Sequence, residues 1–271
     1  MTEFTFSTGA KSAAGVKVIL TSGSGINAGK FISEEEAAAL RAAVRKQKFD
    51  GKAGTFAEIF NGKTRIVAAG TGARPNALDL QILGGKLYKK ISGEETAAVF
   101  IPADKKNPLS AGETAAGIAL GIELGGYRFD KYFTKKPADS YPKLEKVEFL
   151  SETQIDDKEF AANRALANAV RYARDLCNEP ANNLTPEIYA ADIKRLDYLG
   201  IDVTVLDEAK LHDLGMDMLL SVAQGSVNSP RVAVLQWKGR KDAKEFDLGL
   251  VGKGVTFDSG GISLKPAANM G

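Results

Sequence analysis

The carboxyl-terminal stretch, residues 248–271 (LGLVGKGVTFDSGGISLKPAANMG), constrains the fold more than any other part of the chain. Residues 248–251 contain no polar side chain, and such a short apolar run predicts a buried strand. Val255–Phe257 is expected to form a second short strand that leads into Asp258. Pro266 then ends any regular structure. The pattern predicts strands that present charged side chains from glycine-rich turns.

Three charged side chains, Lys253, Asp258 and Lys265, stand in this otherwise apolar run. Charged groups are seldom buried unless they are paired or bound to a metal. Lys253 and Asp258 are five residues apart, which places them on opposite faces of a straight strand. A shared site therefore needs a bend, which the glycines on either side of Lys253 allow. The spacing alone leaves two interpretations open: a lysine–aspartate ion pair at a strand end, or a functional site.

Two nucleotide-binding motifs fail in this stretch. A P-loop needs G-x-x-x-x-G-K-[ST], but the first spacing after Gly249 is too short and Gly254 stands where Ser or Thr belongs. A dinucleotide fingerprint needs a third glycine, and Phe257 occupies that position. The glycines here do not form a known phosphate-binding loop.

The run VGKGVTFDSGGISLKP closely resembles the metal-binding segment of the leucyl aminopeptidases, also called cytosol aminopeptidases. Two further runs resemble the same family, DLCNEPANNLTP at 175–186 and VAQGSVNSPR at 222–231. The resemblance implies that Lys253 and Asp258 are ligands of a two-metal centre and that Lys265 is catalytic. The implied metals are Mn or Zn, with Mg as a further option.

The residue types suit that chemistry. A lysine ligand must be a neutral amine, although free lysine has a pKa of about 10.4. Deprotonating it at pH 7 costs about 4 to 5 kcal/mol, and an adjacent divalent ion can offset that cost. Asp258 supplies a hard oxygen that suits Zn, Mn or Mg. Lys265 should stay protonated and polarise the scissile carbonyl or its oxyanion.

Alternating strand and helix patterns in the first half predict an α/β fold. Ser33 and Glu36 form a capping box at the start of one of these helices. The expected strands are 16–20, 64–69 and 97–101, and the expected helices are 34–48, 78–90 and 113–124. With the resemblance, we expect a macro-like N-terminal α/β domain and linker over residues 1–146. The first part of an α/β/α aminopeptidase catalytic domain should follow over residues 147–271.

Several single features have structural interpretations. The turn Gly70–Gly72 follows a strand and could cradle a phosphate, but we favour a structural turn because the glycine motif is incomplete. Cys177 falls on the apolar face of a helix predicted over 160–178 and is expected to be a small buried residue. The lone His212 is expected to be structural. Arginines on the same helix predict a solvated or interface face: Arg164, Arg171 and Arg174.

Composition excludes several classes of protein. The net charge of +2 gives no reason to expect binding to nucleic acid or to an anionic membrane. One cysteine excludes an intrachain disulfide and fits a reducing compartment. No stretch approaches the roughly 20 apolar residues that span a bilayer, and the first residues lack a signal-peptide pattern. A cytoplasmic protein is expected.

The resemblance also implies features of the full-length family. These are peptide substrates, a homohexamer, and a bicarbonate held by an arginine in a segment NTDAEGRL that carries further metal-binding carboxylates. The chain contains no such segment, so we expect an amino-terminal portion that is inactive unaided. The alternative is a non-catalytic module for ligand binding or assembly, which would bind its ligand without metal.

Overall fold

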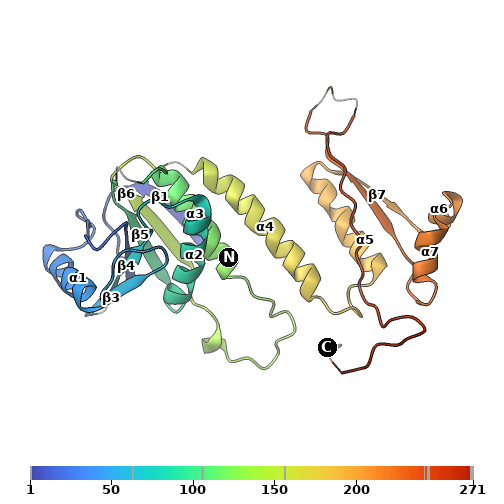
Figure 1. Cartoon of the computed structure of the whole chain (residues 1–271), viewed down its shortest axis with the longest axis horizontal. Coiled ribbons are helices and arrows are strands. Elements are labelled where there is room, and N and C mark those ends of the chain that lie inside the picture. The colour runs from blue at the N-terminus through green and yellow to red at the C-terminus, as the bar shows by residue number, and fades with distance from the viewer. Residues whose placement is uncertain are drawn as a thin grey trace. The chain divides into compact units, whose positions relative to one another are not determined.

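The computed structural model describes residues 2–62, 64–104, 107–155, 157–240, 242 and 245–268. Residues 269–271, the end of the glycine-rich stretch, lie outside the described residues. The chain divides into two compact units, Met1–Asp175 and Leu176–Gly271 (Figure 1). We describe each unit by itself.

The first unit is built on a six-stranded sheet in the order β1-β6-β5-β2-β4-β3. All neighbouring pairs are parallel except β3 and β4. The strands are β1 Glu3–Thr8, β2 Val16–Thr21, β3 Phe56–Asn61, β4 Thr64–Gly70, β5 Thr96–Ile101 and β6 Lys146–Ser151. The helices are α1 Glu34–Lys46, α2 Ala77–Ile91, α3 Ala111–Gly125 and α4 Lys158–Asn178, with a 3-10 turn at Ala138–Ser140.

Helices cover both faces of this sheet, so its strands are buried on each side (Figure 1). One core contains the apolar faces of α2 and α3, and the other contains that of α1. Glycines let α2 and α3 approach closely: a Cβ added at Gly121 would lie 2.0 Å from the Gln81 carbonyl oxygen. This layered arrangement confirms the predicted α/β fold.

Local signals located the elements of this unit well. The Ser33–Glu36 capping box is present, with Ser33 N–H donating to Glu36 Oε2 at 2.8 Å and Glu36 N–H donating to Ser33 Oγ at 3.1 Å. All three predicted strands and all three predicted helices of the first half are confirmed. Strands β1 and β3 were not predicted from the sequence.

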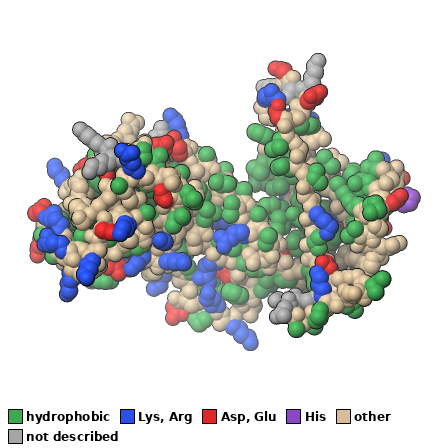
Figure 2. Space-filling model, in the orientation of Figure 1, with side chains coloured by type: hydrophobic (Ala, Val, Ile, Leu, Met, Phe, Trp, Pro, Cys, Tyr) green, Lys and Arg blue, Asp and Glu red, His purple; other side chains and the backbone are tan. Residues whose placement is uncertain are grey.

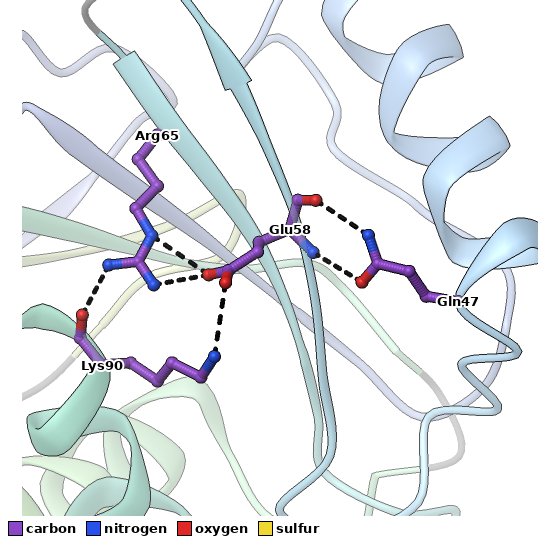
Figure 3. A network of polar contacts seen from close by, with 4 residues as sticks. All are labelled: Gln47, Glu58, Arg65 and Lys90. Atoms are coloured by element: carbon purple, nitrogen blue, oxygen red, sulfur yellow. Dashed lines mark hydrogen bonds and ion pairs between the residues drawn. The ribbon is translucent and has the colours of Figure 1, made fainter.

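Strand β3 forms the antiparallel edge of the sheet, and polar side chains hold it in place (Figure 3). Arg65 donates from Nε to Glu58 Oε2 at 3.0 Å and from Nη1 to the Lys90 carbonyl at 2.6 Å. The Gln47 amide exchanges two hydrogen bonds with the Glu58 backbone, at 3.0 and 3.3 Å, as a neighbouring strand would. Burial tends to raise the pKa of Glu58, but Arg65 and Lys90 outweigh it and hold that pKa below its ordinary value.

Helix α4 caps the end of α3. Arg171 Nη2 donates to the Glu123 carbonyl and Arg174 Nη1 donates to the Leu124 carbonyl, both at 3.2 Å. Helix α3 has no basic residue in its own last turn, and positive charge is favourable at a helix carboxyl end. Two of the arginines assigned to a solvated or interface face therefore lie at a helix–helix contact.

The second unit is smaller and more open. It contains α5 Pro186–Lys194, a 3-10 helix Arg195–Leu199, β7 Asp202–Leu206, α6 Glu208–Asp213, α7 Asp217–Ala223 and β8 Val232–Gln236. Strands β7 and β8 form an antiparallel pair. Thr185 caps α5 by accepting from Ile188 N–H at 3.4 Å, with Pro186 in the first turn. No helix in the described part of either unit is long and apolar enough to cross a membrane.

Two sequence predictions in this region were wrong. Residues 248–251 and 255–257 form no strand, and Leu248 and Leu250 are 71% and 86% exposed. A strand needs a hydrogen-bonding partner and a covered face, and the described residues supply neither to this segment. Cys177 is exposed rather than buried. The face of α4 that packs inward carries Phe160 and Ala167, and the face predicted to be buried, which carries Cys177, is a different one.

The domain boundary expected between residues 146 and 147 stays a prediction, and the compact units of the structure divide at Asp175. The sequence suggested a division after residue 146, at the end of an exposed connection. In the structure the chain returns from that connection as β6, between β1 and β5. The compact first unit then continues along α4 to Asp175.

Candidate active site

A tight loop holds two of the three predicted site residues. The Lys265 N–H donates to the Ser259 carbonyl at 2.9 Å, and Gly260 and Leu264 form an isolated antiparallel bridge. Gly260 has a φ of +93°, and a Cβ there would lie 2.6 Å from the Ser263 carbonyl oxygen. Only glycine fits this position without strain, so the glycine pair after Asp258 allows the loop to close.

Asp258 accepts hydrogen bonds across that loop. Its Oδ1 accepts from Gly260 N–H at 2.7 Å, and its Oδ2 accepts from Lys265 Nζ at 2.8 Å. The Lys265 hydrogen bond, followed by the Gly260 hydrogen bond and the lysine charges, holds the pKa of Asp258 below its ordinary value. Both side chains are about half exposed, 53% for Asp258 and 50% for Lys265, so water screens the pair.

Lys253 lies on the irregular segment before the loop, and its charge also lowers the pKa of Asp258. The spacing in the sequence allows an ion pair between Lys253 and Asp258. In the described residues, the lysine in direct contact with Asp258 is Lys265. The structure therefore joins Asp258 to Lys265 directly, with Lys253 acting on Asp258 through its charge.

The resemblance implies a two-metal centre, and these residues alone would not complete one. They offer one carboxylate and two amines, whereas a single catalytic zinc usually has three protein ligands and an open position. Within residues 2–268, apart from the few that are not described, no three His, Cys, Asp or Glu side chains gather to hold a metal ion. The donor set in this unit does not fit two ions by itself.

Tyr189 is a neighbour of this segment that no sequence motif indicates. It lies on α5, and a Cβ added at Gly254 would lie 3.0 Å from its Cε1 atom. Gly254 therefore lets the chain pass close to the tyrosine ring. The available signal was the second glycine of the G-K-G run, which marks a close approach.

The glycine turn of the first unit offers no free amides to a phosphate. Gly70 N–H donates to Thr55, Thr71 N–H donates to Thr21, and Gly72 N–H donates to Gly51, each to a backbone carbonyl at 2.9 Å. A phosphate cradle needs such groups to point toward the ligand. The structural interpretation of Gly70–Gly72 is confirmed.

Two family models match this chain in order. The N-terminal domain of the cytosol aminopeptidase family matches residues 18–136, and the catalytic domain of that family matches residues 171–271. The chain belongs to the cytosol aminopeptidase family. Lys253, Asp258 and Lys265 all lie within the part that matches the catalytic domain.

Curated relatives agree with this assignment. A probable cytosol aminopeptidase of Rhizobium rhizogenes is 46% identical over 213 residues, covering 76% of this chain and 42% of the relative. One from Sinorhizobium medicae is 40% identical over 280 residues, covering 99% of this chain and 55% of the relative. The chain thus spans about half the length of the curated relatives it matches.

Solved structures support the fold. A mutant of tomato leucine aminopeptidase superposes with a TM-score of 0.78 at 22% identity, covering 95% of this chain and 55% of that one. The bottromycin maturation enzyme BotP, solved in complex with Mn, gives a TM-score of 0.73 at 29% identity, covering 94% and 51%. Together with the family models, these neighbours confirm an N-terminal α/β domain followed by part of an aminopeptidase catalytic domain.

Proposed function

We propose that this chain supplies part of the active site of a two-metal aminopeptidase that releases N-terminal amino acids, leucine among them, from peptides. One observation carries the proposal: Asp258 and Lys265 meet within a glycine-closed loop in the region that matches the family's catalytic domain. Lys253 and Asp258 are assigned to metal binding, and Lys265 to polarising the substrate carbonyl.

The chain's own residues account for part of this chemistry. Lys265 donates one of its three N–H groups to Asp258 at 2.8 Å, so it can donate another to a substrate oxygen, and opening the ion pair would free it to move toward that oxygen. A protonated amine aimed at a developing oxyanion stabilises the transition state more than the ground state. The half exposure of both side chains means that the pair opens at small cost.

The cofactors and assembly belong to the same proposal. Two divalent ions, Mn or Zn with Mg as a third option, suit the oxygen and amine donors, and a neighbour of known structure was solved with Mn. Bicarbonate, a homohexamer and a cytoplasmic location are proposed for the full-length protein on the family resemblance. Residues 1–271 alone should be inactive, because one carboxylate cannot balance two divalent ions.

A chimera tests the proposal. It joins residues 1–271 to the part of the Sinorhizobium medicae relative that lies beyond its match to this chain. We expect release of leucine from a chromogenic amide with Mn or Zn, abolished by a chelator and reduced at least 100-fold by Lys265→Ala. Lys210→Ala removes another half-exposed lysine of the second unit and should leave the rate unchanged. An active chimera that is indifferent to Lys265→Ala, or to the chelator, would contradict the proposal.

A further inference from the structure

The six-stranded sheet of the first unit has two edges, and among the described residues only one of them is sealed. The edges are β3 and β1. At β3, the Gln47 side-chain amide bonds both backbone groups of Glu58, at 3.0 and 3.3 Å, and so occupies the place of a further strand. Strand β1 has β6 as its one neighbour in the described part of the chain. An open edge of this kind is a template for pairing with another strand.

The hydrogen bonds of β1 show which backbone groups the open edge presents. Glu3 N–H donates to the Glu145 carbonyl at 2.7 Å, and Gly9 N–H donates to the Ser151 carbonyl at 2.9 Å. Backbone groups alternate in direction along a strand, so the odd-numbered residues bond β6. Three residues therefore turn their N–H and carbonyl groups to the open edge: Phe4, Phe6 and Thr8.

This edge lacks the usual protection and is well ordered. Residues 4–8 (FTFST) contain no charged residue and no proline, the residues that commonly blunt an edge. Phe6 stacks on Phe149 with ring centroids 5.4 Å apart and packs against Phe160 of α4 at 4.8 Å. The aromatic packing holds β1 in an extended conformation, ready for an incoming strand.

The geometry of the sheet indicates which strand can pair with β1. If β1 of one copy joined β3 of the next, the head-to-tail contact would repeat into an open filament. Gln47 blocks that arrangement because it already bonds the β3 edge. Pairing of β1 with β1 of a second copy is closed by a two-fold axis. With Phe6 opposite itself and Phe4 opposite Thr8 of the other copy, every outward group gains a hydrogen bond.

The charges at the two ends of β1 favour the antiparallel orientation. Glu3 is the first residue of the strand, Lys11 follows shortly after its end, and both are exposed. Antiparallel pairing brings Glu3 toward Lys11 of the other copy, whereas parallel pairing sets like charges side by side. The register neighbour of Glu3 on β6, Lys146, is already paired with Glu148 at 2.9 Å.

We propose that β1 of one copy pairs antiparallel with β1 of a second copy about a two-fold axis at Phe6, which joins the two six-stranded sheets into one. The two Phe6 rings then lie side by side as a cross-strand aromatic pair on the face that Phe149 and Phe160 cover. The pairing uses the first unit alone, so it does not rest on the proposed function.

Proline substitutions at neighbouring positions test the pairing in residues 1–271, by sedimentation velocity and amide hydrogen exchange. We expect a dimer in which exchange at the outward amides slows roughly 10-fold as the concentration rises through the dissociation constant. Thr8→Pro removes an outward donor from each copy and should weaken the dimer roughly 10-fold, without changing the Tm of the monomer. Ser7→Pro removes a donor to β6 and should lower that Tm instead.

Charge exchange tests the orientation. Glu3→Lys should weaken the dimer roughly 3-fold, because it sets a like charge against Lys11 of the other copy. Adding Lys11→Glu to Glu3→Lys should restore the dissociation constant. A double variant that dimerises no better than Glu3→Lys alone would overturn the antiparallel orientation.

Three outcomes would overturn the pairing itself: a monomer at every concentration, unchanged association of Thr8→Pro, or association that leaves exchange at Phe4, Phe6 and Thr8 unchanged. The last would place the contact elsewhere, such as on exposed apolar side chains of the second unit. Slow exchange at these amides in the monomer would equally overturn it, because the chain would then cover the edge itself. Should residues 1–271 precipitate, the same measurements on the chimera described above decide between these outcomes.

Discussion

The two units of this chain use similar residue types with opposite results. In the first unit, a six-stranded sheet lies between helices, and the buried side chains of both apolar cores belong to residues up to Leu150, with Phe160 of α4 packed against one of them. Among the described residues of the second unit, a two-stranded pair and three α-helices leave leucine, valine, isoleucine and phenylalanine side chains exposed to water (Figure 2). Apolar sequence therefore becomes a core only where layers exist to cover it, and substitutions should have very different consequences in the two units.

The largest effect is expected from Phe149→Ala. Phe149 is fully buried in β6 and stacks on Phe6 with ring centroids 5.4 Å apart. Its loss should lower the free energy of unfolding by about 3 to 5 kcal/mol, measured by urea denaturation. Phe257→Ala, which removes an exposed ring of the second unit, should change it by less than about 0.5 kcal/mol. Comparable losses for both would show that the second unit has a core.

Alanine substitutions at two glycines, one in each unit, should give the next largest difference in stability. Gly121→Ala should cost about 1 to 3 kcal/mol, because the new Cβ would lie 2.0 Å from the Gln81 carbonyl oxygen between α2 and α3. Gly225 of the second unit has no atom within 4 Å of an added Cβ. Gly225→Ala should be neutral or slightly stabilising. Thermal melts of the two variants test this, and a stable Gly121→Ala protein would contradict the close helix contact.

A smaller, pH-dependent effect is expected from Glu58. Its pKa is lowered in the fold from an ordinary value of 4.5, so its stabilising contribution is complete above that value and is lost as pH falls through the lowered pKa. Glu58→Gln should therefore cost stability at pH 7 and flatten the loss of stability below pH 4.5. Glu34→Gln, in a more exposed ion pair, is the control. If the loss of stability below pH 4.5 is the same with and without Glu58→Gln, the network of Figure 3 does not stabilise the fold.

The smallest effect on stability is expected at the candidate site, where the informative quantity is the pKa of Asp258. Lys265→Met should raise that pKa toward its ordinary value of 3.8 more than Lys253→Met does, because the Lys265 hydrogen bond is the largest cause of the lowering and the charge of Lys253 is the smallest. Carboxyl-carbon NMR titration measures both. Equal shifts, or a larger one for Lys253→Met, would contradict the pairing of Asp258 with Lys265.

How much the sequence predicted depends on how local the signal is. The Ser33 capping box and the strands at 16–20 and 64–69 follow from residues close in sequence, and all are confirmed. Strands β1 and β3 are defined by the strands they pair with, so their short patterns carried little signal. Residues 248–251 read as a strand by composition, but no partner in the described residues pairs with them.

At the candidate site, too, local sequence signals were predictive and contacts set by the fold were not. Motif resemblance selected Lys253, Asp258 and Lys265, and the loop glycines indicated where the chain turns. Spacing alone could not show that Lys265 rather than Lys253 would contact Asp258, because that depends on the closure of the loop at Gly260. Tyr189, on a separate helix, could be found only once α5 and the Gly254 segment were placed together.

The capping of α3 by α4 has a consequence for exchanging domains between relatives. The carbonyls of Glu123 and Leu124 take their donors from Arg171 and Arg174, nearly 50 residues further along the chain and beyond the connection that looks like a linker. A swap made at that connection would separate a helix from its cap and would also remove β6 from between two strands. A transplantable amino-terminal module is therefore one that keeps its own α4 through Asp175, and recombination among relatives should be tolerated best near that residue.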